Sequence, residues 1–154
     1  MKNLSGKLIA IDMYNCAVEQ ITDPKVAEVL LRQGCEKNSM NPREILCCQE
    51  DGNTEYSLSA ICKQGHVTLH IYPEIGLITA DVFSCYNDAD QAGMGRFLRD
   101  AFDADKSKIT VLDRVDFGSE SDMKPSRQSK ITFTRRTKNL GGKLKKMMLK
   151  PRSI

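Results

Sequence analysis

Residues 57–85 read SLSAICKQGHVTLHIYPEIGLITADVFSC, and apolar and polar side chains alternate along most of this stretch. Alternation of this kind, interrupted by Gly and Pro, is typical of consecutive β-strands joined by short turns. We therefore expect strands over 57–63, 66–72 and 77–85, with turns at Gln64-Gly65 and at Pro73–Gly76.

The alternation also predicts what each face of this sheet carries. Successive side chains of a strand point to opposite faces, so Val67, Leu69 and Ile71 should share one face and His66 and His70 the other. Hydroxyls, a carboxylate and a thiol from the neighbouring strands join the histidines. The apolar face then belongs to the core, and the polar face is a candidate functional site.

Further strands and two helices are predicted on either side of this stretch. The strands are expected over 6–14, 44–49 and 108–115, and the helices over 23–36 and 88–103. Asp23 and Asp88 are credible N-caps, and the first helix should bury an apolar stripe of Val26, Val29, Leu30 and Cys35. The resulting order, β-α-β-β-β-β-α-β, predicts an α+β sandwich in which two helices cover one face of a mostly antiparallel sheet. The other face is left for a ligand or a second subunit.

The composition is that of an ordinary globular protein. The chain has 154 residues, of which 40% are hydrophobic and 28% charged. It contains no apolar run as long as the ~18 residues that a membrane span needs, and its first residues lead directly into the first strand. We therefore expect a cytoplasmic protein without a membrane segment.

The six cysteines do not form a recognisable metal-binding or disulfide pattern. There is no C-x-x-C pair, the chain has two histidines, and Cys47 and Cys48 are adjacent. We predict no metal site, and we expect most of the thiols to be small buried residues.

The composition changes near residue 118, which divides the chain into a domain over 1–118 and a basic extension over 119–154. Residues 120–154 contain eleven Lys or Arg and two acidic residues, a net charge of +9, and residues 1–119 carry −6. Such a segment is expected to be partly disordered. It could contact a polyanion such as nucleic acid, but it has few aromatic residues for base stacking, which favours a solvated tail.

The central stretch resembles a known family. Residues 65–85, GHVTLHIYPEIGLITADVFSC, are similar to the signature of bacterial S-adenosylmethionine decarboxylase. The positions that match are His66, His70, Pro73, Glu74, Gly76, Asp81, Phe83 and Cys85. The opening GKLIAIDMYNC, residues 6–16, resembles the first strand of the family, although Leu8 stands where the family has histidine.

The resemblance implies a decarboxylase of the polyamine (spermidine) pathway. Enzymes of this family pair their protomers, with the ligand sites at or near the interface, so a homodimer is expected here. They also stack the adenine of S-adenosylmethionine on aromatic side chains, and residues 49–55, QEDGNTE, offer no such clamp.

One position departs from the family in a way that bears on its chemistry. The family has Glu-Ser-His where this chain has Gln64-Gly65-His66. In the family this serine attacks the preceding carbonyl, the chain is cleaved, and the serine becomes a pyruvoyl group that serves as the electron sink for decarboxylation. Gly65 has no hydroxyl, so we predict an uncleaved chain without pyruvoyl or any other cofactor.

Other residues of the family's site are retained. By resemblance, Ser57 and His70 assist processing, and Cys85 protonates the decarboxylated carbon and influences processing. His66 and Glu74 are expected to contact the ligand. Imidazoles and thiols can move protons in these ways near neutral pH. His66 and His70 could instead form a structural pair or half of a metal site. We expect Ser57, His70 and Cys85 to share a cavity close to Gly65.

Three functional interpretations are compatible with this pattern. The first is an unprocessed relative that binds S-adenosylmethionine or a similar ligand, or that regulates a paralogous subunit. The second is an active decarboxylase whose carbonyl group comes from another nucleophile, for which Cys62 and Thr68 are the nearest candidates. The third is different chemistry on the same fold, since a fold does not determine a function.

Overall fold

The computed structural model describes residues 6–63, 65–85 and 88–114. These residues form one six-stranded sheet in which every neighbouring pair of strands is antiparallel. The strands are β1 (Gly6–Tyr14), β2 (Pro42–Gln49), β3 (Tyr56–Cys62), β4 (Gly65–Tyr72), β5 (Leu77–Ser84) and β6 (Lys106–Arg114). They lie in the order β2-β3-β4-β5-β1-β6. The predicted basic extension lies outside the described residues.

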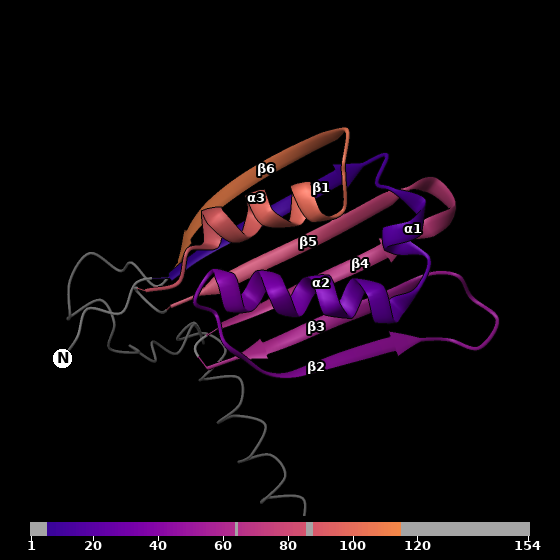
Figure 1. Ribbon diagram of the computed structural model, residues 1–154. Coiled ribbons are helices and arrows are strands. Elements are labelled where there is room, and N and C mark those ends of the chain that lie inside the picture. Colours follow the sequence, from indigo (N-terminus) through magenta and orange to yellow (C-terminus); the bar gives the residue numbers. More distant parts are fainter. Residues whose placement is uncertain (1–5, 64, 86–87, 115–154) are drawn as a thin grey trace, which may run out of the picture. The chain divides into compact units, whose positions relative to one another are not determined.

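Two helices cover one face of the sheet. These are α2 (Pro24–Lys37) and α3 (Gln91–Ala101), which lie side by side on the same side of the strands (Figure 1). The predicted α+β sandwich is therefore confirmed. Two short elements were not predicted: α1 (Val18–Ile21) and the 3-10 helix η1 (Pro73–Ile75), which forms the body of the expected turn before β5.

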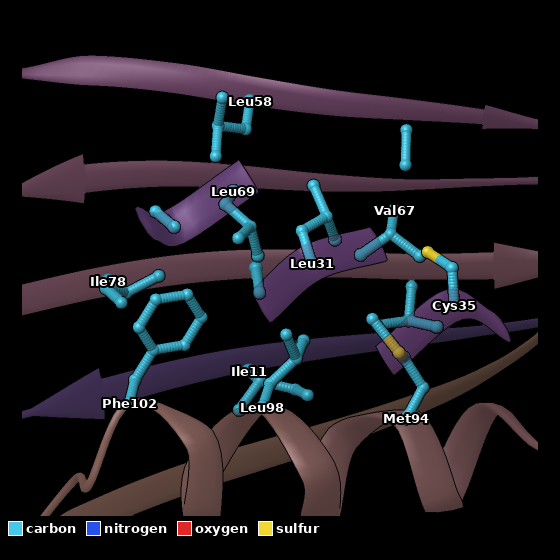
Figure 2. Packing of buried hydrophobic residues seen from close by; sticks show 14 of the residues in the cluster. Ile11, Leu31, Cys35, Leu58, Val67, Leu69, Ile78, Met94, Leu98 and Phe102 are labelled. Carbon is cyan, nitrogen blue, oxygen red and sulfur yellow. The ribbon is translucent and has the colours of Figure 1, made fainter. Parts of the chain in front are cut away.

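The core lies between the helices and the face of the sheet that the alternation marks as apolar. Val67, Leu69 and Ile71 of β4 are completely buried, as predicted. Figure 2 shows Leu31 of α2 and Leu98 of α3 pointing into this layer from the helix side. Burial of this apolar face stabilises the fold through the hydrophobic effect. The alternation in the sequence predicts which face is buried.

The N-caps of the two long helices were predicted from local sequence, and one of the two predictions is correct. Asp23 caps α2 as predicted, because its Oδ1 accepts a hydrogen bond of 2.9 Å from the backbone N–H of Lys25. The predicted cap of the second helix, Asp88, is wrong. Asp90 takes that place, and its Oδ1 accepts a 2.7 Å hydrogen bond from the N–H of Gly93. The backbone N–H of Asp90 is in turn bound to the carbonyl of Asn38, which fixes where α3 begins.

The predicted apolar stripe of α2 is partly wrong. Val26 and Val29 are exposed, and the face that meets the core is formed by Ala27, Leu31, Gly34 and Cys35. Both sets recur at helical spacing, so periodicity alone could not choose between them. A Cβ at Gly34 would lie 2.7 Å from the ring of Phe97 in α3, which shows how closely the two helices approach on that face.

The expectation that most cysteines are buried is also only partly met. Cys16, Cys35 and Cys62 are buried, Cys85 is half-buried, and Cys47 and Cys48 are exposed. The two exposed thiols lie on β2, an edge strand, whose residues are all at least partly exposed because the sheet ends there.

Candidate functional site

The face of the sheet opposite the helices carries a hydroxyl and an imidazole in direct contact. Ser57 of β3 and His70 of β4 lie directly opposite each other in the antiparallel register. Ser57 Oγ is 2.8 Å from His70 Nδ1, which is a short hydrogen bond. Because an imidazole can accept a hydroxyl proton, this pair can act together in proton transfer.

This pair opens onto a hollow of about 290 Å³. The hollow is lined by Cys48, Glu50, Asn53, Glu55, Tyr56, Ser57, His70 and Tyr72. The side chain of Tyr56 is buried in the core on the helix side of the sheet, where its hydroxyl donates a 2.7 Å hydrogen bond to the carbonyl of Ile21 and burial raises its pKa. The hydroxyl of Tyr56 is therefore structural, and the acidic side chains of Glu50 and Glu55 give the hollow its charge.

Gly65 lies at the other end of the β3–β4 hairpin, in a place that has no room for a side chain. It is paired with Cys62 on one side and with Ser84 on the other. A Cβ at this position would overlap the carbonyl oxygen of Phe83 and would lie 2.8 Å from the Cα of Ser84. Both obstacles are backbone atoms of β5, so the strands would have to separate before any larger residue could be accommodated.

Three side chains lie close together near Gly65 on the open face. The ring of His66 lies 5.5 Å from that of Phe83, and the guanidinium of Arg114 lies 5.2 Å from the centre of the same ring. The sequence interpretation gave Phe83 no role. Its position in the polar row of β5 could have indicated that an aromatic ring lies on the candidate face.

Cys85 lies at this same end of the sheet. It directly follows β5, it is half-buried, and a Cβ on Gly6 would be 2.9 Å from its Sγ and 3.1 Å from the ring of Phe83. The candidate site residues on the open face therefore fall into two groups. We call Ser57 and His70 the dyad, and Gly65, His66, Phe83 and Cys85 the glycine cluster.

The two groups do not share a cavity within one chain, so that expectation was wrong. Gly65 and His70 are five positions apart on β4, and at about 3.3 Å per residue this places them roughly 16 Å apart along the strand. The spacing in the sequence is short, but an extended strand converts it into a long distance.

Comparison with known proteins identifies the family. The model of the S-adenosylmethionine decarboxylase family matches residues 7–115. The chain belongs to this family. Its relatives include the S-adenosylmethionine decarboxylase proenzyme of Sulfolobus acidocaldarius, which is 30% identical over 86 residues, or 55% of this chain and 68% of that protein. The proenzyme of Moorella thermoacetica is 24% identical over 109 residues, covering 71% and 86% of the two chains.

A solved structure agrees with the fold. The crystal structure of adenosylmethionine decarboxylase from Aquifex aeolicus has a TM-score of 0.64 to this chain and 19% sequence identity. The alignment covers 73% of this chain and 91% of the other. At this identity the comparison supports the six-stranded sheet with its helices on one face.

The residues at position 65 do not fit the pyruvoyl group of the family. Formation of that group begins from a side-chain hydroxyl, which glycine lacks, and the carbonyl of Phe83 occupies the place of a Cβ. At the dyad, by contrast, the two side chains are both present and are hydrogen-bonded to each other.

Glu74, the other predicted ligand contact, lies on η1 at the dyad end of the sheet. It is exposed, and its Oε1 accepts a 3.0 Å hydrogen bond from the hydroxyl of Thr54. This bond ties η1 to the loop between β2 and β3. His66 and Glu74 are thus at opposite ends of β4 and belong to different groups.

The described part of the chain contains neither a metal-binding cluster nor a membrane-spanning helix. Among residues 6–63, 65–85 and 88–114, no three His, Cys, Asp or Glu side chains are placed to hold a metal ion. Nor does any helix within these ranges have the length and apolar character needed to cross a bilayer.

Proposed function

We propose that this protein is an unprocessed member of the S-adenosylmethionine decarboxylase family that binds S-adenosylmethionine or a closely related ligand without pyruvoyl chemistry. The observation that carries the proposal is the backbone around Gly65. Gly65 lacks the hydroxyl that reacts in the family, and backbone atoms of β5 occupy the space that a side chain would need. The protein would then serve as a ligand-binding or regulatory subunit of polyamine synthesis.

The open face offers groups that suit the parts of S-adenosylmethionine. The ring of Phe83 can provide an apolar surface for adenine, and Arg114 beside it carries a charge that complements a carboxylate. At the dyad end, Glu50 and Glu55 complement the positive charge of a sulfonium or an amine. These groups support a ligand that is cationic at one end and carries an aromatic base.

The distance between the dyad and the glycine cluster supports a homodimer. The two groups lie near opposite ends of one open face, which no other layer of the described chain covers (Figure 1). A second copy placed face to face, with its strands reversed, would bring its dyad over the glycine cluster of the first. Each ligand site would then be completed by two chains, and a paralogous chain could replace one of them.

The alternative of an active decarboxylase with another nucleophile has less support. The Sγ of Cys62 faces the helix side of the sheet, where it lies 3.7 Å from the carbonyl of Ala60. The hydroxyl of Thr68 is on the open face, but it is hydrogen-bonded to the hydroxyl of Ser59 at 3.2 Å. Cys62 thus lies on the face opposite His66, and Thr68 already has a hydroxyl partner, which weakens this alternative.

Calorimetric titration with S-adenosylmethionine tests the proposal. We expect binding to the wild-type protein without release of CO₂, and a roughly tenfold weaker affinity for Arg114→Ala, which corresponds to about 1.4 kcal/mol. Lys106→Ala is the matched control, because Lys106 belongs to the same strand and charge class but lies at its other end, opposite Tyr14.

Two results would count against the proposal. Absence of measurable heat at millimolar S-adenosylmethionine would remove the ligand. Steady release of CO₂ from the intact chain would favour the alternative of an active decarboxylase.

A further inference from the structure

Cys62 occupies an unusual position for a buried thiol. It is the last residue of β3, it is 9% exposed, and it lines a hollow of about 210 Å³ at the helix side of the sheet. Arg43 and Lys63 line the same hollow together with Ser39, Met40, Asn41 and Ser84. Cys62 therefore borders a small cavity that two cationic side chains also line.

A second thiol lies directly behind the first. Cys35 in the last turns of α2 is completely buried, and its side chain points toward the sheet beside Val67 (Figure 2). The side chains of Cys35 and Cys62 interact with each other, and the Sγ of Cys62 also donates a hydrogen bond of 3.7 Å to the carbonyl oxygen of Ala60. The two sulfur atoms are thus neighbours, one on the side of the hollow and the other on the side of the core.

The interaction between the two thiols shifts their pKa values in opposite directions. The interaction with Cys35 lowers the pKa of Cys62 against the opposing effect of burial, and the same interaction together with burial raises the pKa of Cys35. Because the thiolate is the reactive form, Cys62 should react first. Its position at the wall of the hollow acts in the same direction.

We propose that Cys62 is a site of oxidation by hydroperoxides, and that Cys35 resolves the oxidised form into a disulfide that joins α2 to β3. A thiol at the wall of a cavity, nearby positive charge and a second thiol behind it together form the arrangement that reversible thiol oxidation needs. The inference does not depend on the function proposed for the open face, since both thiols lie on the helix side of the sheet.

The chemistry balances with a hydroperoxide as the oxidant. The thiolate of Cys62 attacks one oxygen of hydrogen peroxide, the O–O bond breaks, and the departing hydroxide is protonated to water, leaving a sulfenic acid. The sulfur of Cys35 then attacks the sulfenic sulfur, the S–O bond breaks, and a second water leaves with the proton of Cys35. Two thiols have lost two electrons, and one peroxide has become two waters.

The disulfide would tie down the hairpin end that contains Gly65. Cys62 is the register partner of Gly65, and Gly65 is paired with Ser84 just before Cys85. A bond from Cys62 to α2 would therefore hold the glycine cluster's end of the sheet against the helix. A thiol reductant would release it.

Peptide mapping of the peroxide-treated full-length protein tests the inference. Free thiols are alkylated, and trypsin with a Glu-specific protease then separates Cys35, Cys62 and the Cys47-Cys48 pair onto different peptides. We expect a disulfide-linked pair that contains Cys35 and Cys62 and that disappears after reduction. Exclusive oxidation of the exposed Cys47 and Cys48 would overturn the proposal.

Single variants establish the order of events. In Cys35→Ser, the sulfenic acid should persist on Cys62 and be trapped by dimedone. In Cys62→Ser, dimedone labelling of Cys35 should be at least roughly tenfold lower than the labelling of Cys62 in Cys35→Ser. Equal labelling of both variants would contradict the assigned roles. If a variant fails to fold, limited alkylation of the wild-type protein decides instead, since Cys62 must then be modified before Cys35.

Discussion

Gly65→Ala should lower the free energy of unfolding by about 3 kcal/mol, because the added methyl group would overlap the carbonyl oxygen of Phe83. The obstacle is backbone in the adjacent strand, which cannot turn aside as a flexible side chain can. Denaturant unfolding followed by circular dichroism measures the loss. The double variant Gln64→Glu/Gly65→Ser should be destabilised to a similar extent and should remain uncleaved.

Gly52→Ala is the matched control for this experiment. Gly52 has a φ of +83°, and nothing lies within 4 Å of its missing Cβ, so alanine there meets backbone strain but no collision. We expect a loss of only about 1 kcal/mol. Equal losses of unfolding free energy in the two variants would contradict the close approach of β5 to Gly65. Self-cleavage of the double variant, abolished by His70→Ala, would reveal a dormant processing site instead.

Leu31→Ala should cost about 2–5 kcal/mol, because Leu31 is fully buried between α2 and the sheet and its loss leaves a cavity. Val29→Ala on the same helix should change stability by no more than about 0.5 kcal/mol, since Val29 is 54% exposed. Thermal and denaturant unfolding of the two variants in parallel provides the measurement. The reverse ranking would mean that α2 is rotated from the orientation described.

The contrast between Leu31 and Val29 also shows the limit of sequence reasoning about this fold. In strands, a period of two leaves one choice of buried face, and His66 and Val67 could be assigned to opposite faces from the sequence. In α2, both apolar rows recur at helical spacing. The close contact of Gly34 with Phe97 decides between them, and it depends on a helix that lies far away in the sequence.

The candidate site was predictable to a similar degree. The predicted faces put Ser57 and His70 on the same side of adjacent strands, but the predicted turn at Gln64-Gly65 would have placed Ser57 opposite Tyr72. The observed pairing of Cys62 with Gly65 places Ser57 opposite His70 instead. The closure of β5 onto Gly65 does not follow, because it depends on how near two strands approach at one point. The separation of His70 from Cys85 does not follow from the alternation either, because residues on one face of a sheet can still lie far apart along the strands.

The central claim is that the chain stays in one piece at Gln64-Gly65, and the mass of the denatured, freshly purified protein tests it most directly. We predict a single species at 17.3 kDa that does not react with carbonyl reagents. Two fragments corresponding to residues 1–64 and 65–154, the second with a blocked amino terminus, would contradict the account.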